Sequence, residues 1–269
     1  MVGSSKRFLD ALWSFYDSNR REMPWRNPEP DGSYDPYKIL VSEIMLQQTQ
    51  VDRVIPKYLA FINRFPTVEV LAAAPFSEVL RFWNGLGYNR RAKYIHEAAK
   101  MLAVRTFPKT IDELTELKGV GSNTAAAILV YAYNQPHIFI ETNIRSVLFY
   151  HFFSEKHDIS DGQLRNLLQK LLRDENPRDF YYALMDYGAY LKQNGFGQNS
   201  KSKHYSKQSK FEGSIRQLRG EVLRRALDGL DITQLKRDVS DTRLEYVIDA
   251  LVSEGLILKS GSRIKVADS

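Results

Sequence analysis

Apolar residues recur at helical spacing through most of the 269-residue chain. Phe8, Leu12 and Phe15 share one face of an expected helix between residues 8 and 16, and the apolar residues of 37–51 repeat that spacing. Prolines at 56, 66, 75 and 108 fall where such helices should begin or end. The pattern predicts further helices over 68–74, 76–84, 90–104, 110–117, 122–133, 142–154, 161–173 and 177–191. An all-α body is therefore expected.

The last quarter of the chain has a different pattern. Residues 214–227, 232–238 and 241–254 are predicted to be helices, and 256–266 to form two short strands around a Ser-Gly-Ser turn. No alternating strand pattern occurs before residue 256. Three helices and a hairpin predict a winged helix, a module that often binds DNA through its third helix. Because that helix is nearly neutral here, the module could equally serve for packing or for binding a partner.

A glycine-rich hairpin, Leu117-Lys-Gly-Val-Gly-Ser-Asn-Thr-Ala125, is the most informative motif of the chain. Its two glycines allow a tight turn that exposes amide N–H groups at the start of the next helix, near Ser122. Such a turn suits a phosphate, although a plain joint between two helices has the same pattern. Twenty residues after Gly121 stands Glu141, followed by Thr142 and Asn143.

Charge and composition narrow the class of protein. The net charge is +6, and nine basic residues but only two acidic ones occupy the stretch from Lys192 to Arg225. A solvated charge run fits this stretch, but beside a phosphate-binding hairpin we favour a segment that follows DNA. With no cysteine, the chain has no disulfide, thiolate zinc site, cysteine nucleophile or ordinary iron–sulfur ligand.

The sequence indicates no membrane segment. No apolar run reaches 18 residues, and the N-terminus lacks an apolar signal core. We expect a cytoplasmic, nucleoid-associated protein. No coiled-coil seam is found, so a monomer is expected.

Glu43 is a candidate acid on an otherwise apolar helix. Val41, Ile44 and Met45 surround it in the sequence, so desolvation should raise its pKa and allow it to donate a proton near neutral pH. With Glu141 it could divide the work of cleaving an N-glycosidic bond: one carboxyl protonates the leaving base, and the other stabilises an oxocarbenium-like sugar. Alternatively, each of these two glutamates is an ordinary surface residue or a helix cap.

Four motifs in order carry a family resemblance: Leu46-Gln-Gln-Thr-Gln50, Gly85-Leu-Gly-Tyr88, Gly119-Val-Gly121 and Glu141-Thr-Asn143. Together they resemble the helix-hairpin-helix DNA glycosylases, and among these the MutY-type adenine DNA glycosylases. The likeness runs from about residue 8 to 191 and includes Met23-Pro-Trp-Arg26, Asp35-Pro-Tyr-Lys38, Val54-Ile-Pro56 and Phe65-Pro-Thr67. It implies a two-lobed helix-hairpin-helix fold followed by the small winged helix.

The resemblance implies roles at the reacting bond. Glu43 stands where the family keeps the acid that protonates the excised base, Glu141 where it keeps an aspartate that stabilises the sugar cation, and Asn143 at an active-site asparagine. The pocket for the flipped base would involve Arg21, Trp25, Leu46, Asn123 and Tyr182.

The resemblance also implies DNA contacts. Gln48 resembles the side chain that fills the vacated stack, and Tyr88 the one that intercalates beside the opposing base, which partly restores lost stacking. Further contacts are expected at Gln47, Gly119, Gly121, Ser122, Thr124, Lys201, Lys203 and Lys207. Relatives hold a monovalent cation, K⁺ or Na⁺, through backbone carbonyls, here those of Thr115, Leu117 and Val120.

Four departures from the family pattern matter. Glutamate replaces aspartate at 141, and Asn123 occupies the place of the lysine nucleophile of bifunctional relatives, so strand cleavage by β-elimination is not expected. Lys192 stands at the first cluster cysteine, so the iron–sulfur loop is missing and lysines would take over its DNA contacts. The Nudix-like domain is missing too, and Tyr182 replaces an amide or acid that faces the base.

The resemblance, with these departures, implies a monofunctional DNA glycosylase that acts on double-stranded DNA with a mismatched or damaged base and needs no cofactor. Adenine opposite guanine or 8-oxoguanine is the expected substrate. Thymine or uracil opposite guanine, and an inactive protein that binds mismatches or damage, are the alternatives. The expected domains are a glycosylase domain over 1–192 (lobes about 30–140 and 141–192, the latter with the N-terminal helix), a basic linker over 193–212 and a winged helix over 213–269.

Overall fold

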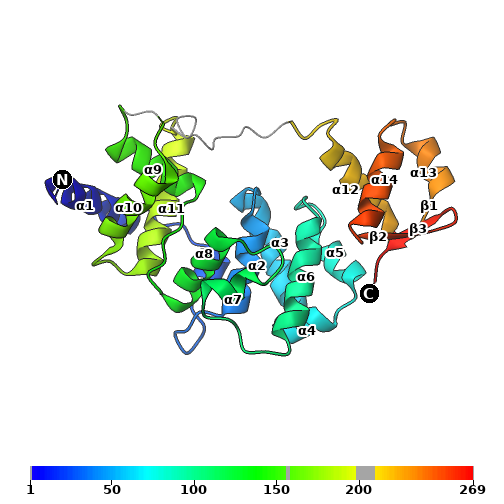
Figure 1. The fold of residues 1–269 in the computed structure, drawn as a ribbon, viewed down its shortest axis with the longest axis horizontal. Helices are drawn as coiled ribbons and strands as arrows, with labels where there is room; N and C mark the ends of the chain where they lie inside the picture. The colour runs from blue at the N-terminus through cyan, green and yellow to red at the C-terminus, as the bar shows by residue number, and fades with distance from the viewer. Residues whose placement is uncertain (1, 156–157, 198–209, 269) are drawn as a thin grey trace. The chain divides into compact units, whose positions relative to one another are not determined.

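The computed structural model describes residues 2–155, 158–197 and 210–268. Its residues form two compact units, each built from separate stretches of the chain (Figure 1). Unit 1 comprises Met1–Ile39, Lys109–Thr115 and Val120–Lys207, and unit 2 comprises Leu40–Pro108, Glu116–Gly119 and Gln208–Ser269. Lys201, Lys203 and Lys207 lie outside the described residues.

Unit 1 is helical in its described part, as the sequence predicts. Its elements are α1 (Val2–Asn19), the short 3₁₀ helix η1 (Pro24–Arg26), α7 (Ile111–Thr115), α8 (Ser122–Tyr133), α9 (Thr142–Phe152), α10 (Asp161–Leu172) and α11 (Pro177–Gln193). Helix α2 (Pro36–Leu46) begins in this unit and continues into unit 2. Helix α11 packs on α9, α1 and α8, and α8 is buried from Ala125 to Ala132.

The contact between α9 and α11 depends on one glycine. A Cβ atom at Gly188 would lie 2.2 Å from the carbonyl oxygen of Asn143. Only a residue without a side chain therefore allows α11 to approach the first turn of α9 this closely. The stacked rings of Phe139 and Tyr181, with centroids 4.1 Å apart, fill the core beside this contact.

Unit 2 joins a helical group to a small mixed module. The helices are α3 (Val51–Arg64), α4 (Val68–Ala73), α5 (Phe76–Trp83) and α6 (Arg90–Leu102), and α6 packs on α4 and α5. The C-terminal module, residues 214–268, contains α12 (Ile215–Ala226), β1 (Leu230–Asp231), α13 (Ile232–Asp238), α14 (Leu244–Ser253), β2 (Ile257–Ser260) and β3 (Arg263–Val266).

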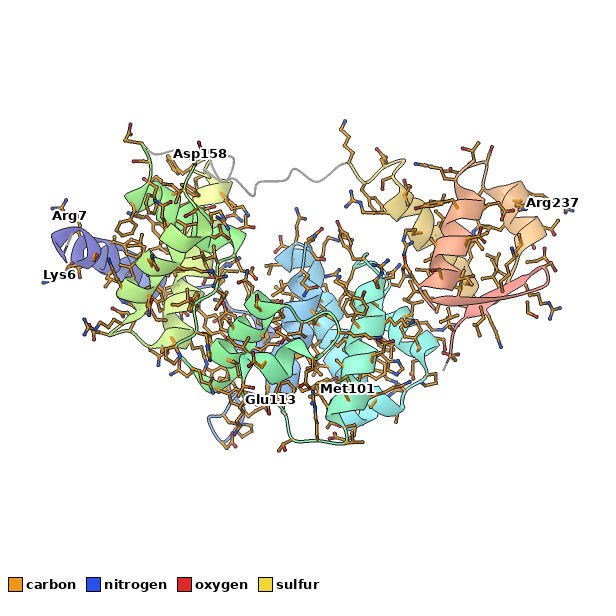
Figure 2. The ribbon with its side chains drawn as sticks, in the orientation of Figure 1. Lys6, Arg7, Met101, Glu113, Asp158 and Arg237 are labelled. Atoms are coloured by element: carbon orange, nitrogen blue, oxygen red, sulfur yellow. The ribbon has the colours of Figure 1, made fainter. Side chains whose placement is uncertain are left out.

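Charged side chains such as Lys6, Arg7 and Arg237 project outward from their helices (Figure 2).

The C-terminal module has the predicted hairpin and one additional strand. β2 and β3 pair antiparallel from Ile257↔Val266 to Ser260↔Arg263, which places the turn at Gly261 and Ser262. β1 pairs with the other edge of β3, giving the order β1-β3-β2. The sequence shows no alternating pattern at β1, because a two-residue strand is too short to have one.

Two helix boundaries also differ from the sequence interpretation. The helix expected over 37–51 ends at Leu46, because Gln48 has a left-handed backbone with φ of 54° and α3 starts only at Val51. Pro56 lies inside α3 rather than at a helix end. Because it falls in the second turn, the helix loses little more than the hydrogen bond of one N–H group.

Candidate active site

Glu141 occupies the position just before α9, as its N-cap residue, and its side chain makes no capping hydrogen bond. Asn143 follows in the first turn of the helix. Burial raises the pKa of the Glu141 carboxyl above its ordinary value. The structure therefore supplies unit 1 with a carboxyl group that is costly to ionise at the start of a helix.

Lys192 lies beside Asn143, at the end of α11. Its ammonium group donates a 3.2 Å hydrogen bond to Oδ1 of Asn143. Burial, and after it the positive charge of Arg21, lowers the pKa of Lys192. Lys192 thus fixes the side chain of Asn143 two residues after Glu141, a contact that sequence spacing did not indicate.

Asp186, on α11, joins the two arginines near the predicted base pocket. It is 2% exposed, and its oxygens accept hydrogen bonds from Nε of Arg21 at 2.7 Å and from both terminal nitrogens of Arg26 at 2.8 Å. Burial acts to raise the pKa of Asp186, but hydrogen bonds and charges of Arg26 and Arg21 outweigh it and hold the pKa below its ordinary value. The sequence interpretation did not include Asp186, whose one signal is a carboxylate directly after the apolar run Ala183-Leu-Met185.

Tyr182 and Trp25 are buried in unit 1. The Tyr182 ring is 5% exposed and lies between the stacked ring of Tyr131, 4.7 Å away, and the guanidinium of Arg26, 4.4 Å away. Trp25 lies in η1 and is 6% exposed. Arg21, another predicted pocket residue of this unit, has about a third of its side chain accessible (32%).

Asn123 connects the start of α8 to the segment before Glu141. Its Nδ2 donates to the carbonyl oxygen of Ile140 at 3.2 Å, and its Oδ1 accepts from Arg165 at 3.0 Å. Both ends of the amide are therefore engaged within unit 1. Helix α8 starts at Ser122, with Gly121 before it and Thr124 in its first turn, which confirms the expected helix start after the glycine turn.

In unit 2, Gln47 fixes the glycine hairpin. Its Nε2 donates a 3.1 Å hydrogen bond to the carbonyl oxygen of Gly119. Gly119 has φ of 82°, and a Cβ atom there would lie 2.9 Å from the ring of Tyr94, so glycine is required. The flanking carbonyls of Thr115, Leu117 and Val120 stay a predicted cation site.

Glu43 and Leu46 belong to α2 and are partly exposed, whereas their neighbours Ile44 and Met45 are buried. Glu43 and Leu46 therefore lie on the partly exposed face of α2, and Ile44 and Met45 lie on its buried face. It belongs to unit 2 and Glu141 to unit 1.

The two predicted DNA-inserting side chains, Gln48 and Tyr88, are presented by left-handed backbone. Their φ angles are 54° and 48°, values that are uncommon outside glycine. One buried arginine, Arg91, holds both loops. It donates to the carbonyls of Gln47 at 2.6 Å and Gly87 at 3.1 Å.

Arg91 also caps the end of α2. It is 7% exposed and donates to the carbonyl oxygens of Ile44 at 2.8 Å and Met45 at 2.9 Å, and to Oγ1 of Thr49 at 3.0 Å. Burial lowers the pKa of Arg91 to about 10. The carbonyls at the C-terminal end of a helix need donors from outside it, and sequence reasoning did not identify the one that serves α2.

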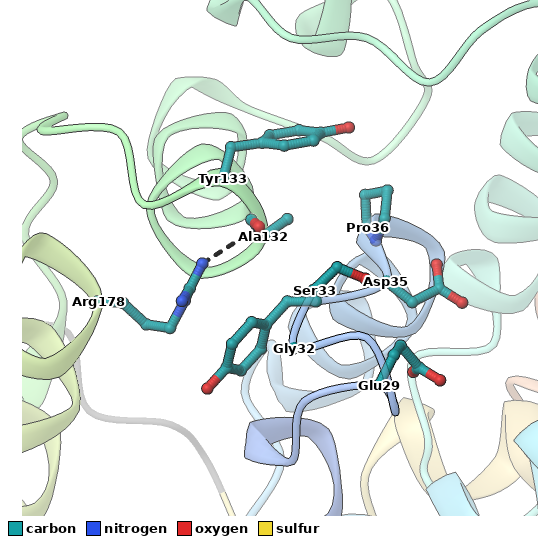
Figure 3. Close-up of a pocket in the computed structure, with 9 residues that line it drawn as sticks. Glu29, Gly32, Ser33, Asp35, Pro36, Ala132, Tyr133 and Arg178 are labelled. Carbon is teal, nitrogen blue, oxygen red and sulfur yellow. Dashed lines mark hydrogen bonds between the residues drawn. The ribbon is translucent and has the colours of Figure 1, made fainter.

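Unit 1 also contains a pocket of about 490 Å³, which is lined by residues of the segment 29–36, the end of α8 and Arg178 (Figure 3). Asp35 caps α2 there by accepting from the amide of Tyr37 at 2.8 Å, and burial raises its pKa. Arg178 stacks on the ring of Tyr34 at 3.7 Å. No residue predicted for catalysis or base binding lines this pocket, so its polar groups serve the helix start and the packing around it.

Several arginines of the basic stretch that was expected to follow DNA are paired with acidic side chains in the structure. Arg219 pairs with Glu254, and Arg224 and Arg225 pair with Glu221. These arginines stabilise the C-terminal module.

Comparison with known proteins identifies the family. A profile described as HhH-GPD superfamily base excision DNA repair protein matches residues 41–174. The chain is 33% identical to an adenine DNA glycosylase of Mycolicibacterium smegmatis, with 91% of each chain covered. The chain belongs to the HhH-GPD superfamily. It is a DNA glycosylase of base excision repair, related to adenine DNA glycosylases.

Two further relatives place it within the HhH-GPD superfamily. An adenine DNA glycosylase of Buchnera aphidicola is 36% identical over 68% of this chain, which spans 52% of that relative. The solved structure of a thermostable thymine-DNA glycosylase is 26% identical, with a TM-score of 0.63 over 76% of this chain and 97% of its own. The helix-hairpin-helix glycosylase fold that the sequence predicted is thereby confirmed.

Two negative findings apply to the part of the chain that the structure describes. None of its helices is long and apolar enough to span a membrane. No group of three or more histidine, aspartate or glutamate side chains there is arranged to hold a metal ion.

Proposed function

We propose that this HhH-GPD protein is a monofunctional DNA glycosylase that flips out a mispaired base and hydrolyses its N-glycosidic bond. Glu43 donates a proton to the departing base, and Glu141 stabilises the positive charge that develops on the sugar. The observation that carries this proposal is the partly buried Glu141 at the start of α9, whose carboxyl pKa is raised by desolvation, with Asn143 held nearby by Lys192.

The raised pKa of Glu141 fits this role. A carboxylate in surroundings of low dielectric constant is costly in the empty site, but it interacts strongly with a cation that forms next to it. The interaction is therefore greater in the transition state than in the ground state, which is the condition for catalysis. Activity should rise with pH as Glu141 ionises.

Adenine opposite guanine or 8-oxoguanine is the proposed substrate. The support is the 33% identity to an adenine DNA glycosylase across 91% of both chains. A thymine or uracil opposite guanine is the second candidate, which the likeness to a thymine-DNA glycosylase favours. Tyr182 is held between Tyr131 and Arg26, and its phenol cannot offer the donor and acceptor pair of an amide.

We also propose that the protein leaves the abasic strand intact. Asn123 occupies the position of the lyase lysine, an amide cannot form a Schiff base, and both ends of this amide hold the Ile140 and Arg165 contacts. No iron–sulfur cluster can be held by cysteines in a chain that has none. A K⁺ or Na⁺ ion at the hairpin carbonyls, and a monomer with a winged-helix C-terminal domain, complete the proposal.

Labelled duplexes with a single A·G, A·8-oxoguanine, T·G or U·G pair test this function. The wild type should cut the A·8-oxoguanine or A·G strand only after alkali treatment, and Glu43→Gln and Glu141→Gln should lose this activity by at least about a hundredfold. Glu69→Gln, an exposed acid of α4, is the matched control.

The other outcomes each point to one alternative. Cleavage of T·G or U·G alone would identify the second substrate class. Binding without cleavage of any duplex would identify an inactive mismatch or damage sensor, and cleavage before alkali would contradict the assignment of Asn123.

A further inference from the structure

The C-terminal module contributes a side chain to the turn that carries Tyr88. Arg216, near the start of α12, donates a 3.0 Å hydrogen bond from Nη1 to the hydroxyl of Tyr88. Its guanidinium carbon lies 5.7 Å from the centre of the Tyr88 ring. Arg216 and Tyr88 are 128 residues apart in the chain, so this contact exists only because the module packs against the helices of unit 2.

Several polar contacts fix the module in this position. Glu254, at the end of α14, accepts 2.6 Å hydrogen bonds from Arg90 on α6 and from Arg219 on α12. Lys93 donates to the carbonyl oxygens of Glu254 at 2.7 Å and Gly255 at 3.2 Å. The end of the third helix is therefore used for packing against α6.

A second group of contacts joins the module to α5. Arg81 donates to the carbonyl oxygen of Leu227 and to Asp228, both at 2.9 Å. The backbone amide of Ser77 donates to Asp268 at 2.6 Å. With two separate groups of contacts, the module is seated on α5 and α6 in a defined orientation within unit 2.

The surroundings of Tyr88 are basic and suit a nucleic-acid strand. Arg53 donates to the carbonyl oxygen of Gly85. The end of the Lys57 side chain lies on the open side of the same glycine, 3.4 Å from where a Cβ atom would stand. Arg216 donates to the hydroxyl of Tyr88 and, at 3.4 Å, to the carbonyl oxygen of Lys210. The turn from Gly85 to Tyr88 thus combines an aromatic ring with basic side chains, which is the usual construction of a surface that binds bases and phosphates.

We propose that Arg216 binds a phosphate of the DNA strand that Tyr88 contacts, so that the C-terminal module forms part of the DNA-binding surface. The inference rests on the proposed function, because it takes DNA as the ligand of the Tyr88 turn. In this arrangement α14 reads no groove with its C-terminal end, which packs on α6. The module acts through Arg216 in the first turn of α12.

Fluorescence anisotropy with a labelled duplex that carries a tetrahydrofuran abasic analogue opposite guanine tests the proposal. This probe has no base to excise, so binding is measured independently of turnover. At about 100 mM salt, Arg216→Ala should bind about five- to tenfold more weakly, and the slope of log K against log[salt] should fall by about 1, as for one lost phosphate contact. Arg216→Lys keeps the charge and should keep the slope.

Two control variants separate this role from a structural one. Arg237→Ala removes an exposed arginine of the same module, on α13 (Figure 2), and should change neither affinity nor slope. Tyr88→Phe removes the hydroxyl that Arg216 binds but keeps the ring, and should keep the wild-type slope. An Arg216→Ala variant with the wild-type salt slope, or a Tyr88→Phe variant that reproduces the Arg216→Ala slope, would overturn the proposal.

The result is distinguishable from a failure of the proposed function. If no mismatch duplex is cleaved but Arg216→Ala changes the salt slope on the abasic probe, the glycosylase assignment fails and the Arg216 contact stands. If mismatch cleavage occurs and the slope is unchanged, the reverse holds.

Discussion

The guanidinium of Arg91 donates a 2.6 Å hydrogen bond to the carbonyl oxygen of Gln47, 44 residues earlier in the chain. The same group binds the carbonyl oxygen of Gly87 at 3.1 Å. Two loops with left-handed residues, one carrying Gln48 and the other Tyr88, therefore share one buried anchor. Strained backbone persists only where surrounding contacts over-determine it, and here Arg91 supplies those contacts.

Replacing Arg91 with methionine should be severely destabilising. The variant keeps most of the apolar stem but leaves several carbonyl oxygens without their donor, which should lower the free energy of unfolding by about 2–4 kcal/mol. Urea unfolding measures this change. Arg105→Met, which removes an exposed arginine paired with Glu116, should cost less than about 1 kcal/mol. Equal losses in the two variants would contradict the anchoring role of Arg91.

A side chain at Gly188 should disrupt the start of α9. The Cβ atom of Gly188→Ala would meet the backbone of Asn143, and such overpacking should cost about 3 kcal/mol and slow base excision by displacing Asn143. Gly220→Ala is the matched control, because Gly220 lies inside α12 with open space around it. That variant should be about 0.5–1 kcal/mol more stable than the wild type. Thermal unfolding of both variants, with the excision assay, checks the prediction.

The Asp186 carboxylate should be required for the stability of unit 1. Asp186→Asn would leave Arg21 and Arg26 without their negative partner and should cost about 3 kcal/mol at pH 7. The pKa of Asp186 is lowered in the folded protein, so its contribution is present above the ordinary carboxyl pKa and is lost as pH falls through the folded value.

Unfolding in urea at neutral and acidic pH measures this dependence for Asp186→Asn. The difference from the wild type should shrink in acid. Asp238→Asn, which breaks the partly exposed pair with Arg225, should stay within about 1 kcal/mol of the wild type. A gap that is constant with pH would show that Asp186 acts by packing alone.

The contribution of Glu141 to stability should depend on pH in the opposite direction to that of Asp186. Its pKa is raised by burial, so the folded state binds the proton more tightly than the unfolded state does. The contribution of Glu141 to the free energy of unfolding is therefore fully present below the ordinary glutamate pKa, and it is lost as pH rises through the pKa of the folded state. Glu141→Gln should be more stable than the wild type at pH 7.5, and this advantage should vanish in acid.

Glu69→Gln provides a control of opposite sign for that measurement. The hydrogen bond from Thr67 lowers the pKa of Glu69, so removing its charge should not stabilise the protein at neutral pH. If Glu141→Gln were less stable than the wild type at pH 7.5, the carboxylate would have a stabilising partner and the proposed electrostatic role would fail.

Local patterns in the sequence determined much of this protein. Helical periodicity predicted the helices of both units. The Gly119 and Gly121 turn predicted where α8 begins, and residue spacing predicted the hairpin at 256–266. The order of four short motifs was enough to identify the superfamily, because such motifs depend on residues that are neighbours in the chain. The total lack of cysteine alone excluded a cysteine-ligated cluster.

Only the tertiary structure decided how the candidate residues are held. The end of α2 at Leu46 depends on the hydrogen bonds from Arg91. The charge of Asp186 is stabilised by Arg21 and Arg26, which are more than 150 residues away in the chain. β1 forms because β3 offers it an edge, and Arg216 reaches Tyr88 because the C-terminal module packs on α5 and α6. Such pairings follow from packing across the chain, where the free energy gained by burial and hydrogen bonding outweighs local preference, and no periodicity records them.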